Sequence, residues 1–445
     1  MTGSAESDWA GPETDLMTPA VYLDYNATTP VRPEAAAAVV DALGLTGNAS
    51  SVHRFGRLAR RKLEDAREAV AALVGAPAER VVFTSGGTEA NNLALTGAGR
   101  VRCLVSAGEH DSVLNAAAGM EGGAEPGMKR GAEPGMERGA EPGMERGAEP
   151  GMERGAEPGM ERGAARIPLR PDGVVDLDTL EVLLGEDPRP ALVSVMLANN
   201  ETGVIQPVAR AAETAHGRGA LVHCDAVQGA GKIPVDMAAL GVDLLSLSAH
   251  KLGGPQGVGA LIVAEGLELA PLMRGGGQER RHRAGTENLP GIAGFGAAAE
   301  CALAGLERMA GLAELRDRLE RCLRARAPEI KIYGAGAPRL PNTSCFGVPG
   351  LAAEIQVIAL DLAGIAVSAG AACSSGKVAP SHVLGAMGAS QAEAGSAIRI
   401  SLGWDSGAAG IERFLEAWSA LYSRSARGTP AGEPGGLISA GGTTK

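Results

Sequence analysis

Short apolar runs alternate along this chain with longer stretches in which apolar residues recur at helical spacing. The runs are bounded by Gly, Ser, Asn or Asp, as buried strands are, and fall at residues 81–84, 101–105, 191–197, 221–224, 244–248 and 258–263. A helical pattern begins at Thr88, directly after the first run and its glycine turn. Alternating strands and helices predict right-handed crossovers and a mainly parallel sheet covered by helices on both faces. The predicted fold class is α/β.

The length of 445 residues exceeds what one hydrophobic core usually supports, so two packed domains are expected. One region cannot belong to either core. Residues 123–162 are five tandem octapeptides, GAEPGMKR once and then GAEPGMER four times. A proline and two glycines in each octapeptide exclude a continuous helix, and little apolar surface remains to bury. This composition predicts a flexible surface insertion over 121–163, with a specific binding role for the repeats as the alternative. Disordered tails are expected at 1–18 and 426–445.

Net charge, apolar run length and cysteine spacing exclude several classes of protein. A formal net charge of -11 argues against a general nucleic-acid binder, which needs a basic surface. No apolar stretch approaches the ~20 residues that span a bilayer, and the acidic first twenty residues are unlike a leader peptide. We therefore expect a cytoplasmic protein without membrane contact. The six cysteines form no C-x-x-C pair and no cluster at zinc spacing, which indicates reduced thiols and no metal site.

Polar residues with catalytic chemistry follow several of the predicted strands. His110, Asp225 and Lys251 each come at or just after a strand, and Ser85–Glu89 stands where a strand passes into a helix. Each has an ordinary explanation when taken alone: a core histidine, a helix cap, a solvated charge. Ligands of a parallel sheet bind beyond the carboxyl ends of its strands, so together these residues predict one site.

The residue types at this edge suit one cofactor. A lysine amine forms a Schiff base with an aldehyde, and an aspartate keeps a pyridine nitrogen protonated so that the ring withdraws electrons. Free N–H groups at a helix N-terminus, with Ser, Thr and His side chains, hold a phosphate. The sequence therefore predicts a pyridoxal 5'-phosphate site.

Longer motifs carry a family resemblance. They are YLDYNATTP at 22–30, SGGTEANN at 85–92, NNETG at 199–203, HCDAVQ at 223–228, SAHK at 248–251, RAGTEN at 283–288 and SAGAACSSG at 368–376. In this order they resemble the cysteine desulfurase family, class V aminotransferase-like enzymes of the fold-type I pyridoxal-phosphate group. The resemblance extends from about residue 20 to about residue 425. It implies a large cofactor-binding domain at 32–303 and a smaller α+β domain formed by 19–31 and 304–425. One departure is the missing proline after Asn48, which concerns local loop geometry only.

The resemblance also implies roles for individual residues. Lys251 would be the Schiff-base lysine, Asp225 the partner of the pyridine nitrogen, and His110 the residue stacked on the ring and shuttling protons. Gln228 would bind the cofactor phenolate oxygen, while Asn200 would lie beside cofactor and substrate carboxylate. The remaining positions are the phosphate-binding Gly87, Thr88, Ser248 and His250, Thr286 reaching in from the second subunit of a homodimer, and Arg399, which would clamp the substrate carboxylate.

Cys373 separates a desulfurase from a plain aminotransferase. It lies in a small, polar, glycine-flanked segment, whereas the other cysteines have apolar or helical surroundings. A thiolate that attacks the substrate sulfur and then carries it away as a persulfide needs such a tether. The expected reaction converts L-cysteine to L-alanine and passes sulfur from Cys373 to an acceptor protein in iron–sulfur cluster assembly or thiolation. The alternatives are a selenocysteine- or cysteine-sulfinate-acting relative, an ordinary class V aminotransferase, and a non-catalytic interaction protein that works through its repeats.

Overall fold

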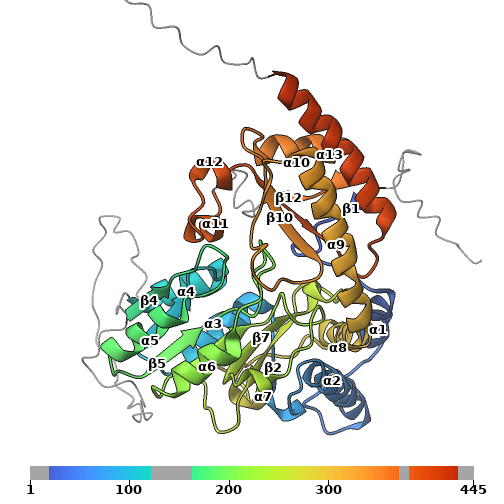
Figure 1. The fold of residues 1–445 in the computed structure, drawn as a ribbon. Helices are drawn as coiled ribbons and strands as arrows, with labels where there is room; N and C mark the ends of the chain where they lie inside the picture. Colours follow the sequence, from blue (N-terminus) through green and yellow to red (C-terminus); the bar gives the residue numbers. More distant parts are fainter. Residues whose placement is uncertain (1–19, 122–162, 370–379, 429–445) are drawn as a thin grey trace, which may run out of the picture.

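The computed structural model describes residues 20–121, 163–369 and 380–428 (Figure 1). The octapeptides at 123–162 and Cys373, both singled out above, lie outside the described residues. The same holds for most of the two predicted tails, although the last helix continues to Gly428, slightly beyond the predicted start of the C-terminal tail.

A seven-stranded sheet occupies the lower half of Figure 1. Its strands are β2 (Val81–Thr84), β3 (Arg102–Ser106), β4 (Gly163–Ile167), β5 (Ala191–Ser194), β6 (Leu221–Asp225), β7 (Leu244–Ser248) and β8 (Gly259–Val263), in the order β2-β8-β7-β6-β5-β3-β4. Only β8 runs antiparallel to its neighbours. The prediction of a mainly parallel sheet is confirmed, and β5 is shorter than the apolar run 191–197 that predicted it.

Helices cover both faces of this sheet because its strands are apolar on both sides. Val81, Phe83 and Leu245 pack into one core cluster with the α2 and α8 helices, whereas Val82 and Leu244 pack into another with α3 and α4. Successive strand residues point to opposite faces, so these short runs bury nearly every side chain. The helices of this part are α1 (Pro33–Leu43), α2 (Arg54–Leu73), α3 (Gly87–Gly97), α4 (Asp111–Glu121), α5 (Leu177–Glu186), α6 (Val208–His216), α7 (Met237–Leu240) and α8 (Leu289–Ala304), with short 3-10 helices η1 (Ala78–Arg80), η2 (Ala249–Lys251) and η3 (Gln278–Arg281).

A smaller antiparallel sheet lies above it in Figure 1. Its strands, in spatial order, are β12 (Ser368–Ala369), β13 (Ala397–Ser401), β10 (Thr343–Gly347) and β9 (Lys331–Ile332). The surrounding helices are α9 (Leu306–Arg326), α10 (Ala353–Leu362), α11 (His382–Ala386), α12 (Gln391–Ala394) and α13 (Ala408–Gly428). Phe346, Phe414 and Trp418 are fully buried at its centre, and the Phe346 ring meets each of the other two edge to face.

The N-terminal segment joins this smaller sheet from far along the sequence. Strand β1 (Val21–Tyr22) pairs in parallel with β11 (Ile365–Ala366), and Asp24 forms a bridge with Ser401 of β13. The residues that follow, Asn26 to Thr29, then reach the carboxyl edge of the large sheet. One short segment therefore links the two sheets at the edge where the candidate site was expected.

Among the described residues, no single helix is both long and apolar enough to cross a membrane. The pair α8 and α9, bent by 65° where they meet, passes such a test of length and composition only when the two are taken together.

Candidate active site

Lys251 follows β7 and extends toward the N-terminal segment. Its Nζ donates hydrogen bonds to the backbone oxygens of Asn26, at 2.6 Å, and Ala27, at 2.7 Å. Burial, followed by the nearby charge of Arg399, lowers the pKa of this amine to about 8. An amine with a lowered pKa is unprotonated more often near neutral pH, so Lys251 is prepared to act as a nucleophile and as a base.

Asp225, the last residue of β6, is 6% exposed. Its Oδ1 accepts a hydrogen bond from the Val227 backbone N–H at 3.0 Å, and its Oδ2 accepts one from Asn91 Nδ2 at 2.8 Å. Two donors on a buried carboxylate fix its orientation at the edge of the sheet. A carboxylate held in this way can pair with a protonated ring nitrogen.

The start of α3 lies against the end of β7. A Cβ added at Gly87 would come within 3.1 Å of Val227 Cγ2 and 3.5 Å of Ser248 Cβ, so glycine permits this close approach. The first N–H groups of α3, from Gly87 and Thr88, have no partner within their helix. His250 Nδ1 lies 3.1 Å from Thr28 Oγ1, and burial, with the neighbouring charge of Lys251, lowers its pKa to about 4. These neutral donors at a helix N-terminus form a cradle that suits a phosphate.

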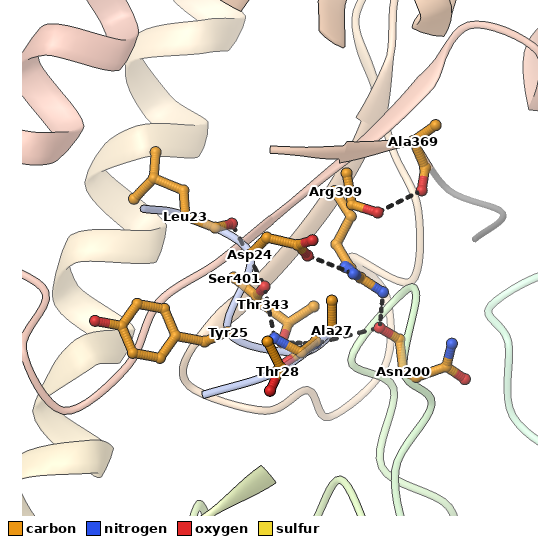
Figure 2. Close-up of polar contacts among 12 residues, drawn as sticks. Leu23, Asp24, Tyr25, Ala27, Thr28, Asn200, Thr343, Ala369, Arg399 and Ser401 are labelled. Carbon is orange, nitrogen blue, oxygen red and sulfur yellow. Dashed lines mark hydrogen bonds and ion pairs between the residues drawn. The ribbon is translucent and has the colours of Figure 1, made fainter. Parts of the chain in front are cut away.

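Arg399 reaches the same edge from β13 of the smaller sheet. Figure 2 shows its guanidinium between the Asp24 carboxylate, at 2.6 Å from Nη2, and the Asn200 backbone oxygen, at 3.0 Å from Nη1. The side chain is nearly fully buried, and its Nε has no hydrogen-bond partner among the residues that the structure describes. A buried donor without a partner is costly, and the planar guanidinium is a group that can bind a carboxylate through two N–H groups.

Comparisons with known proteins agree with this chemistry. The aminotransferase class-V family model matches residues 21–125 and 161–414. A cysteine desulfurase of Cereibacter sphaeroides is 44% identical over 403 residues, which are 89% of this chain and 94% of that protein. The chain belongs to the cysteine desulfurase group of the class-V aminotransferase family. Within this family, a cysteine desulfurase IscS of Dictyoglomus turgidum is 38% identical over 391 residues, 86% of this chain and 89% of its own length.

Solved structures place the fold in the same family. A NifS-like protein of Rickettsia africae has a TM-score of 0.75 at 32% identity and covers 91% of this chain and 99% of its own. DndA of Streptomyces lividans has a TM-score of 0.64, also at 32% identity, and covers 87% of this chain and 99% of its own. The predicted family and the predicted fold class are therefore confirmed.

Asn200 and Thr286, which the family resemblance singled out, lie as follows in the described chain. Asn200 meets Arg399 through its backbone oxygen, and its side-chain amide points away from the guanidinium (Figure 2). Thr286 is exposed and lines a hollow together with Thr84, Ser85 and Arg283. Lys251 lines a different hollow. The described chain thus brings Lys251 and Arg399 to one edge without Thr286.

Asn26 connects several parts of the candidate site. The sequence did not suggest this role. Its backbone oxygen accepts hydrogen bonds from Lys251 Nζ and, at 3.0 Å, from Gln228 Nε2. Its side-chain Nδ2 donates to Thr343 Oγ1 on the smaller sheet at 2.9 Å. These partners lie more than two hundred residues from Asn26, so the motif at 22–30 that contains it did not reveal this role.

Lys232 is a second residue that sequence reasoning missed. It is 5% exposed, and its Nζ donates to Asn26 Oδ1 at 2.7 Å and to Gln228 Oε1 at 2.5 Å. Burial lowers its pKa well below the usual lysine value. Since Gln228 Oε1 accepts from Lys232, the amide of Gln228 is fixed with its Nε2 as the remaining donor. The only sequence signal is the spacing of four residues between Gln228 and Lys232.

Glu109 and Glu201 are buried acids beside the predicted site residues. Glu109 accepts a 2.5 Å hydrogen bond from the Met196 backbone N–H, and its pKa is raised by burial and by the nearby Asp225. Glu201 accepts a 2.5 Å hydrogen bond from Ser381 Oγ, and burial raises its pKa to about 7. Glu109 comes directly before His110 and Glu201 directly after Asn200, so position alone gave no reason to separate them from surface acids.

Replacing Glu201 by glutamine should remove a pH-dependent cost. With a folded pKa of about 7 against a usual 4.5, the folded state holds more protons than the unfolded state between these values. Stability from this group is therefore lost as pH rises through that window. Glu201→Gln mimics the protonated acid, and should exceed the wild type in free energy of unfolding at pH 8 by about 1–3 kcal/mol but match it near pH 5.

Chemical denaturation of both proteins at the two pH values measures this difference. Glu181→Gln is the matched control, because the Glu181 side chain is 65% exposed and should change stability little at either pH. An advantage of Glu201→Gln that is the same at pH 5 and pH 8 would contradict the prediction.

Proposed function

We propose that this protein is a pyridoxal-phosphate-dependent cysteine desulfurase. It converts L-cysteine to L-alanine and transfers the sulfur to Cys373 as a persulfide, for delivery to an acceptor protein in iron–sulfur cluster assembly or thiolation. The observation that carries this proposal is the position of three groups at one sheet edge. They are a buried lysine of lowered pKa, an aspartate that accepts two hydrogen bonds, and a buried arginine. Relatives at 44% and 38% identity that bear the name cysteine desulfurase support the substrate.

The residues at this edge fit the cofactor group by group. Asp225 would hold its ring nitrogen, and Gln228, with its amide fixed by Lys232, would donate to its phenolate oxygen. Gly87, Thr88, Ser248 and His250 would hold its phosphate. When bound through its aldehyde to Lys251, the cofactor supplies an electron sink for charge that develops at the substrate Cα.

The protein's own side chains would perform the remaining steps. Arg399, with Asn200 beside it, would bind the substrate carboxylate, which places the Cα proton near Lys251 Nζ. Lys251 would remove that proton, and His110 would move protons at the substrate. The Cys373 thiolate would form a bond to the substrate sulfur as the carbon–sulfur bond breaks. Alanine then leaves after protonation of its carbon, and the sulfur remains on Cys373 as the persulfide.

Two domains and a homodimer belong to this proposal. Residues 32–303, interrupted by 121–163, would form the cofactor domain, and 19–31 with 304–425 the smaller one; Leu23 already packs in the core cluster of Phe346 and Trp418. Val40, Leu43 and Phe55, on α1 and α2, are 68%, 68% and 58% exposed. Such apolar side chains suit a subunit interface. Thr286 of the partner subunit would then complete the phosphate site, in a dimer located in the cytoplasm.

Incubation of the purified protein with L-cysteine and a thiol reductant tests the proposal. Alanine and sulfide should appear in equal amounts, from a protein with the visible absorbance of lysine-bound cofactor. Cys373→Ser should keep that absorbance and lose sulfide release. A yellow protein that makes no alanine from cysteine would move the function to another pyridoxal-phosphate reaction. Deleting 123–162 should leave the turnover intact, whereas a protein that works only through its repeats would lose its partner.

A further inference from the structure

Four side chains form one hydrogen-bonded chain behind the proposed site. It begins at Asp225, whose Oδ2 lies 2.8 Å from Asn91 Nδ2. The same Nδ2 lies 2.9 Å from Ser112 Oγ, and Ser112 Oγ lies 2.9 Å from His110 Nδ1. Asp225 ends β6, Asn91 lies on α3 and Ser112 on α4, and His110 directly precedes α4.

The direction of every link in this chain follows from its first member. A carboxylate only accepts, so Asn91 must present its amide nitrogen to Asp225. That nitrogen has a second hydrogen, which it donates to Ser112 Oγ. The hydroxyl, having accepted at its oxygen, directs its own hydrogen to His110 Nδ1. The Ser112 backbone N–H also donates to Nδ1, at 3.1 Å. A ring nitrogen that accepts from two donors carries no hydrogen, so the proton of neutral His110 lies on Nε2.

Two further observations single out Asn91. It is 1% exposed, and its Oδ1 has no hydrogen-bond partner within the described part of the chain. An unpaired buried carbonyl is costly, and such a cost in a folded protein calls for an explanation. The Asn91 amide nitrogen donates to two acceptors at once, while its oxygen stays unpaired. Packing of α3 alone does not require this arrangement.

We infer that Asn91 and Ser112 are positioning residues. They fix the orientation of the Asp225 and His110 side chains relative to each other and hold His110 as the tautomer with its proton on Nε2. Because Nε2 of the exposed His110 has no partner among the described residues, it is the nitrogen that can face a ligand. Neutral His110 in this tautomer therefore presents its Nε2–H to a ligand as a hydrogen-bond donor. The consequence for turnover rests on the proposed function, whereas the tautomer does not.

Nitrogen NMR of the full-length, cofactor-free protein tests the tautomer without any turnover. The His110 ring, assigned with a His110→Gln variant, should show a pyridine-type Nδ1 and a pyrrole-type Nε2. Ser112→Ala and Asn91→Leu should each move these shifts toward the averaged values of a mixed population. A protonated Nδ1 in the wild type, or shifts unchanged in both variants, would overturn the inference. Ser419→Ala is the matched control, because the Ser419 hydroxyl donates to the Leu415 backbone oxygen within α13. Thermal unfolding identifies any variant that fails to fold.

Turnover of cysteine then tests the coupling. Each single variant should lower kcat about tenfold with little change in KM, and Asn91→Leu should also weaken cofactor binding by about tenfold, because Asp225 loses a donor. The double variant should be no worse than Asn91→Leu alone, since both changes break one chain. Losses that multiply in the double variant would contradict a connected chain. If neither the wild type nor any variant desulfurates cysteine, the proposed function fails, while the NMR result still decides the tautomer.

Discussion

The Lys251→Ala variant is expected to lose kcat for cysteine on the order of ten-thousandfold, the largest effect of any single change considered. The variant removes both the amine that would bind the cofactor aldehyde and the base that would take the Cα proton, and such groups contribute about 10² to 10⁴ each when acting alone. Turnover and the visible spectrum measure the loss together. Lys331→Ala is the matched control, because Lys331 is exposed and its amine pairs with Glu393 at the surface and lies over the Tyr333 ring.

A small amine added to the solution should restore part of the Lys251→Ala activity, since it can take the proton in place of the missing side chain. A variant that turns over cysteine at the wild-type rate would contradict the assignment. So would one that recovers nothing with an amine yet still binds cofactor and cysteine.

The same lysine gives the cofactor-free protein a pH signature. Its folded pKa of about 8 lies below the usual 10.5, so between these values the unfolded chain holds more protons than the folded one. Stability from this group is lowest below pH 8 and rises with pH across the window. Lys251→Ala should flatten that rise in denaturation experiments, whereas Lys331→Ala should retain it.

The sequence predicts a site residue when its role follows from its own strand, and misses it when its partners lie far away in the sequence. Asp225 and Lys251 stand directly at strand ends, and the parallel sheet brings strand ends together, so local patterns were sufficient to place them. Asn26 and Lys232 are bonded to each other although more than two hundred residues separate them in the sequence. Apolar periodicity gives no sign that a lysine at position 232 is buried, because the groups that compensate its charge come from a distant segment.

The contacts of Arg399 also could not be predicted from its motif. Its motif identified it as the carboxylate clamp, yet its pairing with Asp24 across 375 positions depends on how β1 joins the smaller sheet. The same holds for Asn200: the motif placed this residue beside the substrate, and the fold uses its backbone oxygen for Arg399. Sequence patterns thus predict which elements meet at the edge, and packing between the sheets decides which atoms face each other.

Arg399→Lys is expected to lower kcat/KM for cysteine by about tenfold to a hundredfold, mainly through a higher KM. Lysine keeps the positive charge beside Asp24, so the half-buried carboxylate retains a partner and the fold should persist. What it loses is the planar fork that would bind a carboxylate through two N–H groups. Steady-state kinetics with cysteine separates KM from kcat.

Arg339→Lys provides a sharp control because Arg339 also forms a buried two-point pair, with Glu320 at 2.7 and 3.0 Å, away from the site. This variant should lose stability and keep the wild-type KM. The opposite pattern is expected of Arg399→Lys, because lysine can keep the ion pair with Asp24 but cannot bind a substrate carboxylate as a planar fork. An unchanged KM in Arg399→Lys would mean that the carboxylate binds elsewhere.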